Sequence, residues 1–317
     1  MRELEILDII QKNLNNSDLI GDDCAYLKDL DTYITQDTLV EDVHFSRHTI
    51  SPYQLGRKAV SVNLSDIACS LAKALYISIS LSIPKNVKNN FVDELYRGIN
   101  DVCSEYGVNV SGGDITGSDK IVISICALAK RNCDFLTSRS FAKKGDYILV
   151  TGNFGASAAG FHSLSNFLYA EQNLINAHLN PTPKLKEAYY LSKIINENIA
   201  AMDCSDGLID ALYKISLHSK HTLCVDFNKI PVLKELKDYC NRNKLDYKHL
   251  VKWGAEDYEL IVCVNEETYK KIDKNLFTLI GRVHNKDKKA CVVITDKEKE
   301  QIITKEIFEK NTYNHFA

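Results

Sequence analysis

Aspartates at the ends of apolar runs are the residues of this sequence with the clearest chemical potential. They occur in five segments: Asp22 and Asp23 in LIGDDCAYL, Asp37 in YITQD, Asp66 in VNLSDIA, Asp114 in VNVSGGD, and Asp203 and Asp206 in AAMDCSDGL. A carboxylate in such a place must be paired, must cap a helix or must hold a metal ion, because an isolated buried charge is costly.

Each aspartate taken singly has an ordinary explanation as a turn residue or a helix cap. Ser205, for example, is predicted to cap a helix that begins there, with Asp206 in its first turn. Five segments with the same pattern favour a shared role. Oxygen ligands gathered without clusters of His or Cys suit Mg²⁺ and not zinc or copper. Because Mg²⁺ takes one or two carboxylates per ion and bridges to phosphates, the set predicts several Mg²⁺ ions that carry a nucleotide.

The common phosphate-binding loops are absent from the sequence, which has neither a P-loop nor a dinucleotide fingerprint. Gly112-Gly113-Asp114 and Gly152-Asn153-Phe154-Gly155 remain as places where backbone N–H groups could approach an anion, although most glycine pairs are turns. Arg139 and Lys143-Lys144 could supply positive charge, or they could belong to a solvated linker.

The elements that must position these residues alternate between helical and strand patterns, which predicts an α/β (α+β) chain in two domains. The polar, charged stretch 130–146 contains the predicted boundary, which divides the chain into domains 1–137 and 138–317. Each domain is expected to place helices on a mixed or mainly antiparallel sheet. Helices are predicted over 3–14, 52–73, 87–106, 156–170, 184–197 and 205–219, and strands over 33–35, 75–83, 108–111, 121–129, 147–151, 222–227, 258–264, 277–283 and 290–295.

Composition narrows the class of protein. The chain has 317 residues, of which 45% are hydrophobic and 26% charged, and its formal net charge is −3. This balance argues against nucleic acid or a membrane surface as the main partner, and the longest apolar run, Ala74–Ile83, is far too short to span a bilayer. The N-terminus is typical of a helix and not of a signal peptide, and ten scattered cysteines without a C-x-x-C pair are typical of reduced thiols. We therefore expect a cytoplasmic protein.

Read in order, seven motifs resemble those of the thiamine-monophosphate kinase family. They are GDDCAYL, ITQDTLVEDVHF, GRKAVSVNLSDIA, SGGDITG, KKGDYILVTGNFGASAAG, AMDCSDGLIDAL and GAEDYEL. This family belongs to an ATP-binding superfamily that also contains aminoimidazole ribonucleotide synthetase, selenophosphate synthetase and the hydrogenase-maturation protein HypE. The resemblance runs from about residue 20 to 265, with a weaker echo in the C-terminal residues 313–316.

The resemblance implies transfer of the γ-phosphate of ATP onto thiamine monophosphate, which gives thiamine diphosphate and ADP. It also implies a homodimer, in which the N-terminal ATP/Mg-binding domains pair their sheets into a barrel. By the same resemblance, the metal ligands are Asp23, Thr35, Gln36, Asp37, Asp66, Asp114, Asp203 and Asp206. The ATP contacts are Gly113, Asp114, Arg139, Ser205 and Tyr96, and the contacts to thiamine monophosphate are His44, Glu256 and Tyr313. No residue is assigned as a nucleophile or a general base, because the acceptor phosphate is already largely deprotonated near neutral pH.

Three departures from the family pattern stand out. Ile67–Ala74 reads IACSLAKA where the family commonly has A-A-M-G-A-x-P, which predicts an altered helix–strand corner. Gln36 replaces the usual Thr, and GAED replaces GGED. Two alternatives stay open: another ATP-dependent synthetase of the same superfamily, and a non-catalytic nucleotide-binding relative. The complete set of aspartates argues against a non-catalytic relative.

Overall fold

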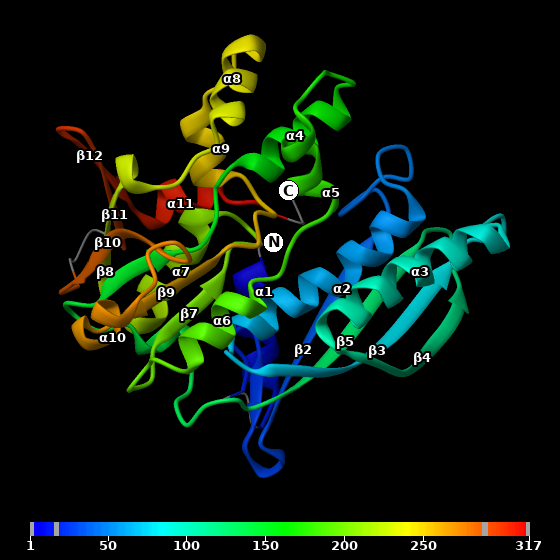
Figure 1. Ribbon diagram of the computed structural model, residues 1–317, viewed down its shortest axis with the longest axis horizontal. Helices are drawn as coiled ribbons and strands as arrows, with labels where there is room; N and C mark the ends of the chain where they lie inside the picture. The colour runs from blue at the N-terminus through cyan, green and yellow to red at the C-terminus, as the bar shows by residue number, and fades with distance from the viewer. Residues whose placement is uncertain (1–2, 16–18, 287–290, 315–317) are drawn as a thin grey trace.

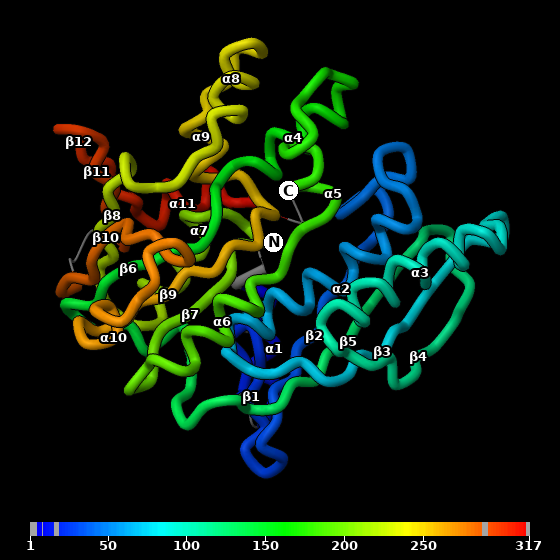
Figure 2. The backbone as a smooth tube through the Cα atoms, in the orientation of Figure 1, coloured from blue at the N-terminus to red at the C-terminus, as the bar shows by residue number. Residues whose placement is uncertain are grey.

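The chain folds around two β-sheets, each of which is packed against helices (Figure 1). The computed structural model describes residues 3–15, 19–286 and 291–314. The weak C-terminal resemblance to the family, at residues 313–316, therefore lies only partly within the described residues, because His315 and Phe316 fall outside them. Figure 2 shows that the blue and cyan first part of the chain and the yellow to red last part occupy opposite sides of the molecule.

The first sheet contains five strands in the order β1-β2-β5-β3-β4, and only the β3–β4 pair is parallel. This pair is joined through helix α3, which makes a β-α-β unit. The elements of this part are α1 (Glu3–Asn13), β1 (Ala25–Leu27), β2 (Thr32–Val40), α2 (Pro52–Cys69), β3 (Lys73–Ile83), α3 (Asn89–Tyr106), β4 (Asn109–Gly117) and β5 (Val122–Lys130).

Helices α2 and α3 pack against each other and cover one face of this sheet (Figure 1). Helix α2 begins at a capping box, in which Ser51 and Gln54 exchange hydrogen bonds, and Pro52 occupies its first turn. The two helices come close because Gly56 and Gly98 lie in their contact, where a Cβ on Gly56 would lie 2.0 Å from the carbonyl oxygen of Leu95. The edge strand β4 is exposed along its whole length.

The second sheet contains seven strands in the order β12-β11-β8-β10-β6-β9-β7, and only β8 and β11 pair in parallel. Its strands are β6 (Tyr147–Val150), β7 (Ala200–Asp203), β8 (Thr222–Asp226), β9 (Leu260–Val264), β10 (Thr278–His284), β11 (Val292–Asp296) and β12 (Lys299–Ile303). The helices of this part are α4 (Ala156–Ser165), α5 (Gln172–Leu179), α6 (Leu185–Ser192), α7 (Leu208–Ser219), α8 (Lys234–Asn243), α9 (Tyr247–Trp253), α10 (Glu266–Lys271) and α11 (Lys305–Asn311).

Strands β6, β7 and β9 of the second sheet are buried on both faces, with successive side chains of a strand on opposite faces. Ile148 and Val150 belong to a core with helices α4, α7 and α8. Leu149, between them, belongs to a different core that contains residues of α6 and the C-terminal end of α2. Helix α2 therefore packs on the second sheet as well as on the first, and it joins the two parts of the chain.

Several predicted elements are confirmed with shorter bounds, and the ends have local causes. The helix predicted over 52–73 ends at Cys69, since Leu71 takes a left-handed conformation with φ of 52°. The helix predicted over 156–170 ends at Ser165, because Phe167 does the same with φ of 53°, and α5 is a separate helix that was not predicted. The predicted helix start at Ser205 is wrong. Helix α7 begins at Leu208 and its N-cap is Gly207, whose φ of 107° suits glycine.

The mixed α/β architecture is the one expected from the sequence. The first sheet ends at Lys130 and the second begins at Tyr147, but the boundary after residue 137 stays a prediction. No helix in the described ranges combines the length and the apolar character that crossing a bilayer requires. All ten cysteines are free thiols.

Candidate active site

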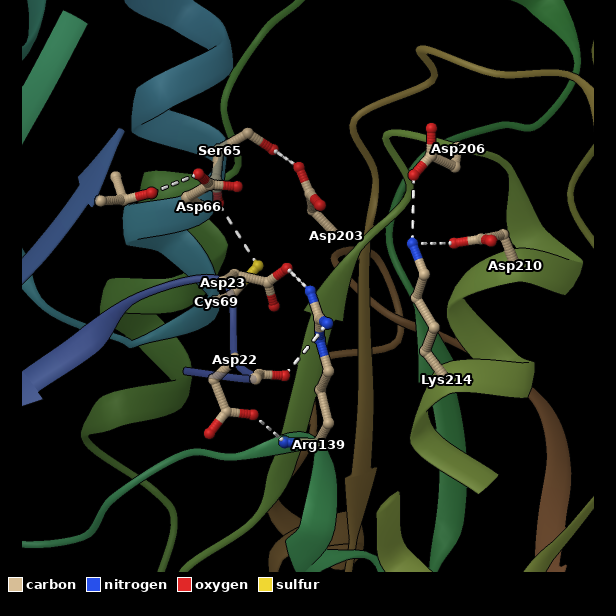
Figure 3. Close-up of polar contacts among 12 residues, drawn as sticks. Asp22, Asp23, Ser65, Asp66, Cys69, Arg139, Asp203, Asp206, Asp210 and Lys214 are labelled. Atoms are coloured by element: carbon tan, nitrogen blue, oxygen red, sulfur yellow. Dashed lines mark hydrogen bonds and ion pairs between the residues drawn. The ribbon is translucent and has the colours of Figure 1, made fainter. Parts of the chain in front are cut away.

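Three of the predicted metal ligands, Asp23, Asp66 and Asp203, converge in space. One carboxylate oxygen from each lies within 4.8 Å of the corresponding oxygens of the other two. Asp23 stands just before β1, Asp66 in the last turns of α2, and Asp203 at the end of β7 (Figure 3). We call these three residues the carboxylate cluster. It lies where the two parts of the chain meet.

Helix α2 holds the cluster together through hydrogen bonds from neighbouring side chains. Thr35 of β2 donates to Asp66 over 2.6 Å. Ser65 of α2 donates to Asp203 over the same distance (Figure 3). Asn63, two residues before Ser65, accepts a hydrogen bond of 3.1 Å from the backbone N–H of Asp37. The helix thus fixes strand β2 and strand β7 on its two sides.

The carboxylates of this region repel one another in a setting that excludes water. Burial, followed by the charges of Asp23 and Asp206, raises the pKa of Asp37 to about 6. Burial, followed by the charge of Asp23, raises the pKa of Asp203 to about 8, and Asp66 is shifted in the same direction. Among the described residues, the buried Oδ1 of Asp203 has no hydrogen-bond partner. A divalent cation that prefers oxygen ligands fits this arrangement, because it would supply both the missing positive charge and the missing partner.

Arg139 closes one side of the cluster. Its guanidinium donates to Asp23 over 2.5 Å and to the carbonyl of Gly21 over 3.1 Å, while its backbone N–H donates to Asp22 over 2.7 Å. Burial alone would lower the pKa of Arg139, but the charge and hydrogen bond of Asp23 raise it above its usual value. In the described structure this predicted ATP contact thus orients the segment that carries Asp23.

Asp206 stands at the margin of the cluster. Its carboxylate lies 3.1 Å from the ammonium of Lys214, which also lies 2.7 Å from Asp210 (Figure 3). Asp210 is almost completely buried, and Thr312 donates a hydrogen bond of 3.0 Å to it. The C-terminal segment that leads to Tyr313 is thereby attached to helix α7. Tyr313 itself is 52% exposed.

Four predicted residues lie apart from the cluster. The side chain of Gln36 is on the opposite face of β2 from Thr35 and Asp37, where it donates to Ser124 over 3.2 Å. A metal contact from Gln36 on the cluster side would therefore come from its backbone.

Gly113 and Asp114 lie on the exposed edge strand β4, with β5 and β3 between them and Asp37. Three strand spacings put roughly 14 Å between Gly113 and Asp37 within one chain. Gly113 also has a packing reason to be glycine, because a Cβ there would lie 1.8 Å from the carbonyl oxygen of Ile79. Tyr96 lines a shallow hollow of about 560 Å³ on helix α3, and none of the residues that line this hollow belongs to the carboxylate cluster.

The predicted contacts to the second substrate come from two loops and the C-terminal segment. His44 follows β2, and its Nδ1 accepts a hydrogen bond of 3.0 Å from the backbone N–H of Val40. Glu256 lies beside the loop that follows Asp203, because its backbone N–H donates to the carbonyl of Ser205 over 2.6 Å. Ser205, a predicted ATP contact, thus connects Glu256 to the segment that contains Asp203 and Asp206.

The three acidic residues of GAEDYEL have different roles. Glu256 contacts Lys58 and His178. Asp257 accepts hydrogen bonds from the backbone N–H groups of Gly155 and Ser157, and so caps the start of helix α4. Glu259 accepts from Thr151 over 2.6 Å and lies 3.1 Å from Lys184. Only Glu256 is therefore left to face a ligand.

Sequence reasoning missed four residues that support the site: Lys58, Ser65, His178 and Lys214. Lys58 carried a usable signal, because a lysine in the apolar pattern GRKAVSVNL needs a buried anionic partner. Lys214 carried one too, because it follows Asp210 by four residues in a predicted helix. His178 carried none, since only the fold brings Glu256 near it.

The chain is similar to proteins of known family. The family model described as "AIR synthase related protein, N-terminal domain" matches residues 21–130, which span the first sheet and include Asp23 and Asp66. A thiamine-monophosphate kinase from Buchnera aphidicola subsp. Schizaphis graminum is 34% identical to the chain, over 99% of this chain and 98% of the relative. The first part of the chain thus resembles an AIR synthase related N-terminal domain.

Two solved structures narrow the class further. One, described as AaThiL complexed with AMPPCP and TMP, superposes with a TM-score of 0.86 at 30% identity and covers 99% of this chain and 97% of that chain. The thiamine monophosphate kinase from Aquifex aeolicus has a TM-score of 0.83 at 30% identity, over 96% of this chain and all of that chain. The chain belongs to the thiamine-monophosphate kinase family.

Proposed function

We propose that this chain is a kinase that transfers the γ-phosphate of ATP to the phosphate of thiamine monophosphate, with thiamine diphosphate and ADP as products. Family membership supports the reaction, as does the similarity to a structure that holds AMPPCP and TMP. The observation that carries the proposal is the carboxylate cluster, in which three acids from distant segments converge, and the buried Asp203 keeps an oxygen without a partner among the described residues. Such a group suits a reaction between two anions.

Asp23, Asp66 and Asp203 would hold Mg²⁺, with Asp37 and Asp206 at the margin of the site. Gln36 and Asp114 remain proposed ligands, Gln36 through its backbone. When bound, Mg²⁺ would neutralise the negative charge that spreads over the transferred phosphoryl group.

The residues of the chain hold the carboxylates in place and thereby align the two reactants. Arg139 fixes the segment of Asp23, and Thr35 and Ser65 fix two carboxylates from the opposite side. Because the acceptor phosphate is already ionised, alignment accounts for most of what the protein must do, and no described residue is needed as a nucleophile. We therefore propose in-line transfer without a phosphorylated enzyme.

We also propose a homodimer that forms through the first sheet. Strand β4 is an exposed edge, and it carries Ile115, which is 70% exposed, and Val110, which is 46% exposed. Edge strands with exposed apolar side chains are ready partners for a second chain. In such a dimer Gly113 and Asp114 would lie at the interface, which accounts for their distance from the cluster of their own chain.

The decisive experiment incubates the protein with Mg²⁺, γ-³²P-ATP and thiamine monophosphate and measures labelled thiamine diphosphate. Labelled product, with no label retained on the denatured protein, is the expected result. Label trapped on the protein would contradict direct transfer. ATP binding without product from any acceptor would support a non-catalytic relative, and turnover with only another acceptor would support a different synthetase.

A further inference from the structure

Lys58 is the most deeply buried cation of the described structure that does not contact the carboxylate cluster. It lies on helix α2, and its side chain is 1% exposed. Its ammonium lies 2.9 Å from Oε2 of Glu256, which comes from the loop before β9. A buried ammonium is costly unless it is paired, and Glu256 supplies the negative charge that makes burial of Lys58 possible.

His178 reaches the same oxygen from helix α5. Its Nδ1 lies 3.0 Å from Oε2 of Glu256, and its side chain is 8% exposed. Burial lowers the pKa of this imidazole, and the nearby charge of Lys58 adds to the effect, although Glu256 opposes both. A neutral His178 with its proton on Nδ1 donates to Glu256, so one carboxylate oxygen receives two donors.

The other oxygen of Glu256 is left available. Among the described residues no hydrogen bond or ion pair reaches Oε1, and the side chain of Glu256 keeps 21% of its surface exposed. Burial would raise the pKa of Glu256, but Lys58 and His178 lower it to about 2. Glu256 therefore presents one ionised oxygen as a hydrogen-bond acceptor.

The backbone around Glu256 needs this support. Glu256 and Tyr258 both take left-handed conformations, with φ of 64° and 51°. Such conformations are costly for residues other than glycine and persist when surrounding contacts determine them. Two contacts of the loop do so: Glu256 N–H donates to Ser205, and Tyr258 N–H donates to Cys204 over 3.1 Å. Lys58 adds the only described ion pair that ties this loop to the first part of the chain.

We propose that Lys58, together with His178, is a positioning residue that aims Oε1 of Glu256 at the exocyclic amine of the substrate pyrimidine. The inference rests on the proposed function. Thiamine monophosphate has a single kind of N–H donor, which is that amine. Because the Lys58–Glu256 pair has no net charge, Glu256 selects a hydrogen-bond donor here and does not serve as a counter-ion for the thiazolium.

The test compares binding of thiamine monophosphate with binding of the phosphorylated thiazole half, which lacks the pyrimidine. In calorimetry, Lys58→Met should bind thiamine monophosphate about tenfold more weakly or worse. A loss of this size is expected when the hydrogen bond between the amine and the charged Glu256 is no longer aligned. Affinity for the thiazole phosphate and the KM for ATP should stay within about twofold of the wild type. Arg57→Met is the matched control, because Arg57 adjoins Lys58 but pairs with Asp101 and Glu105 on α3.

A second variant distinguishes loss of positioning from loss of stability. Lys58→Met leaves Glu256 buried without its cation, whereas Lys58→Met with Glu256→Gln removes both charges and should recover thermal stability without recovering affinity for thiamine monophosphate. Unchanged affinity in folded Lys58→Met would overturn the proposal. An equal loss for both phosphates and for ATP would also overturn it, since that pattern marks a purely structural role. A wild-type protein that binds neither phosphate would instead refute the proposed function.

Discussion

Ser65 of helix α2 donates a hydrogen bond of 2.6 Å to Asp203 at the end of strand β7, although 138 residues separate them. The same helix carries Asp66, whose carboxylate lies against that of Asp203. The two parts of the chain therefore meet at a group of like charges, which is unfavourable until a cation binds. Stability and metal binding should consequently be linked in this protein.

In the absence of metal, the variant Asp203→Asn should be more stable than the wild type, and its advantage should grow with pH. The folded-state pKa of Asp203, about 8, lies above the value of about 4 in an unfolded chain. The stability associated with this carboxyl is fully present below pH 4 and is lost as pH rises through 8. Urea unfolding in EDTA at several pH values measures the difference.

Saturating Mg²⁺ should reverse this order at pH 8 if the ion binds as proposed, because Asp203→Asn would lack one of the proposed ligands. Wild-type stability that is independent of Mg²⁺, or a variant less stable than the wild type in EDTA at pH 8, would show that Asp203 is a structural residue.

Asp206→Asn should abolish most of the kinase activity and leave the melting temperature nearly unchanged. Asp206 is partly exposed beside Lys214, so its charge contributes little to folding. We expect kcat to fall at least about a hundredfold because a proposed Mg²⁺ contact is lost. Steady-state kinetics and thermal melts give the two quantities.

Asp210→Asn is the matched comparison, since Asp210 binds the same ammonium but is buried and also accepts from Thr312. This change should cost about 1–3 kcal/mol of stability and less activity than Asp206→Asn. The opposite ranking of the two variants would place Asp206 in the structural framework.

Arg139→Met should destabilise the metal-free protein by about 3 kcal/mol, because it leaves Asp23 buried beside two other carboxylates without its cation. The KM for ATP should also rise if Arg139 contacts the nucleotide. Arg131→Met is the control, since its pair with Asp31 is solvent-exposed and should contribute little. Equal effects of the two variants would contradict the role of Arg139 at the cluster.

Ile115→Lys should convert a dimer into a monomer. A charged side chain on the exposed edge strand β4 opposes pairing with a second chain. Light scattering should give about 72 kDa for the wild type, twice the 35.8 kDa of one chain, and half of that for the variant. A wild-type monomer at micromolar concentration would remove the dimer from the proposed function.

The sequence identified the acids of the site better than it identified their partners. Asp23, Asp66 and Asp203 each ended or interrupted an apolar run, which is a local signal, and the structure brings all three together. Ser65 and Lys58 act across the fold, and no local pattern connects either residue with its partner. Thus the convergence of these three acids could be anticipated from the chain, whereas most of the contacts that support them could not.

The fold was predictable to a similar degree. The period-2 pattern of LYISISLSI marked β3, which forms at Lys73–Ile83. The short strand β7 escaped prediction because Ala200–Asp203 is buried on both faces and shows no alternation. The start of α7 was misplaced by three residues, since Ser205 is held by Glu256 in a loop and the turn is made by Gly207.

Helix α2 holds Glu256 through Lys58 and Asp203 through Ser65. Each residue added to an α-helix turns everything beyond it by about 100°. A single insertion or deletion between positions 58 and 65 would thus swing one set of contacts away from its partners while the other stayed in place. This stretch of chain can change its amino acids over evolution far more readily than its length.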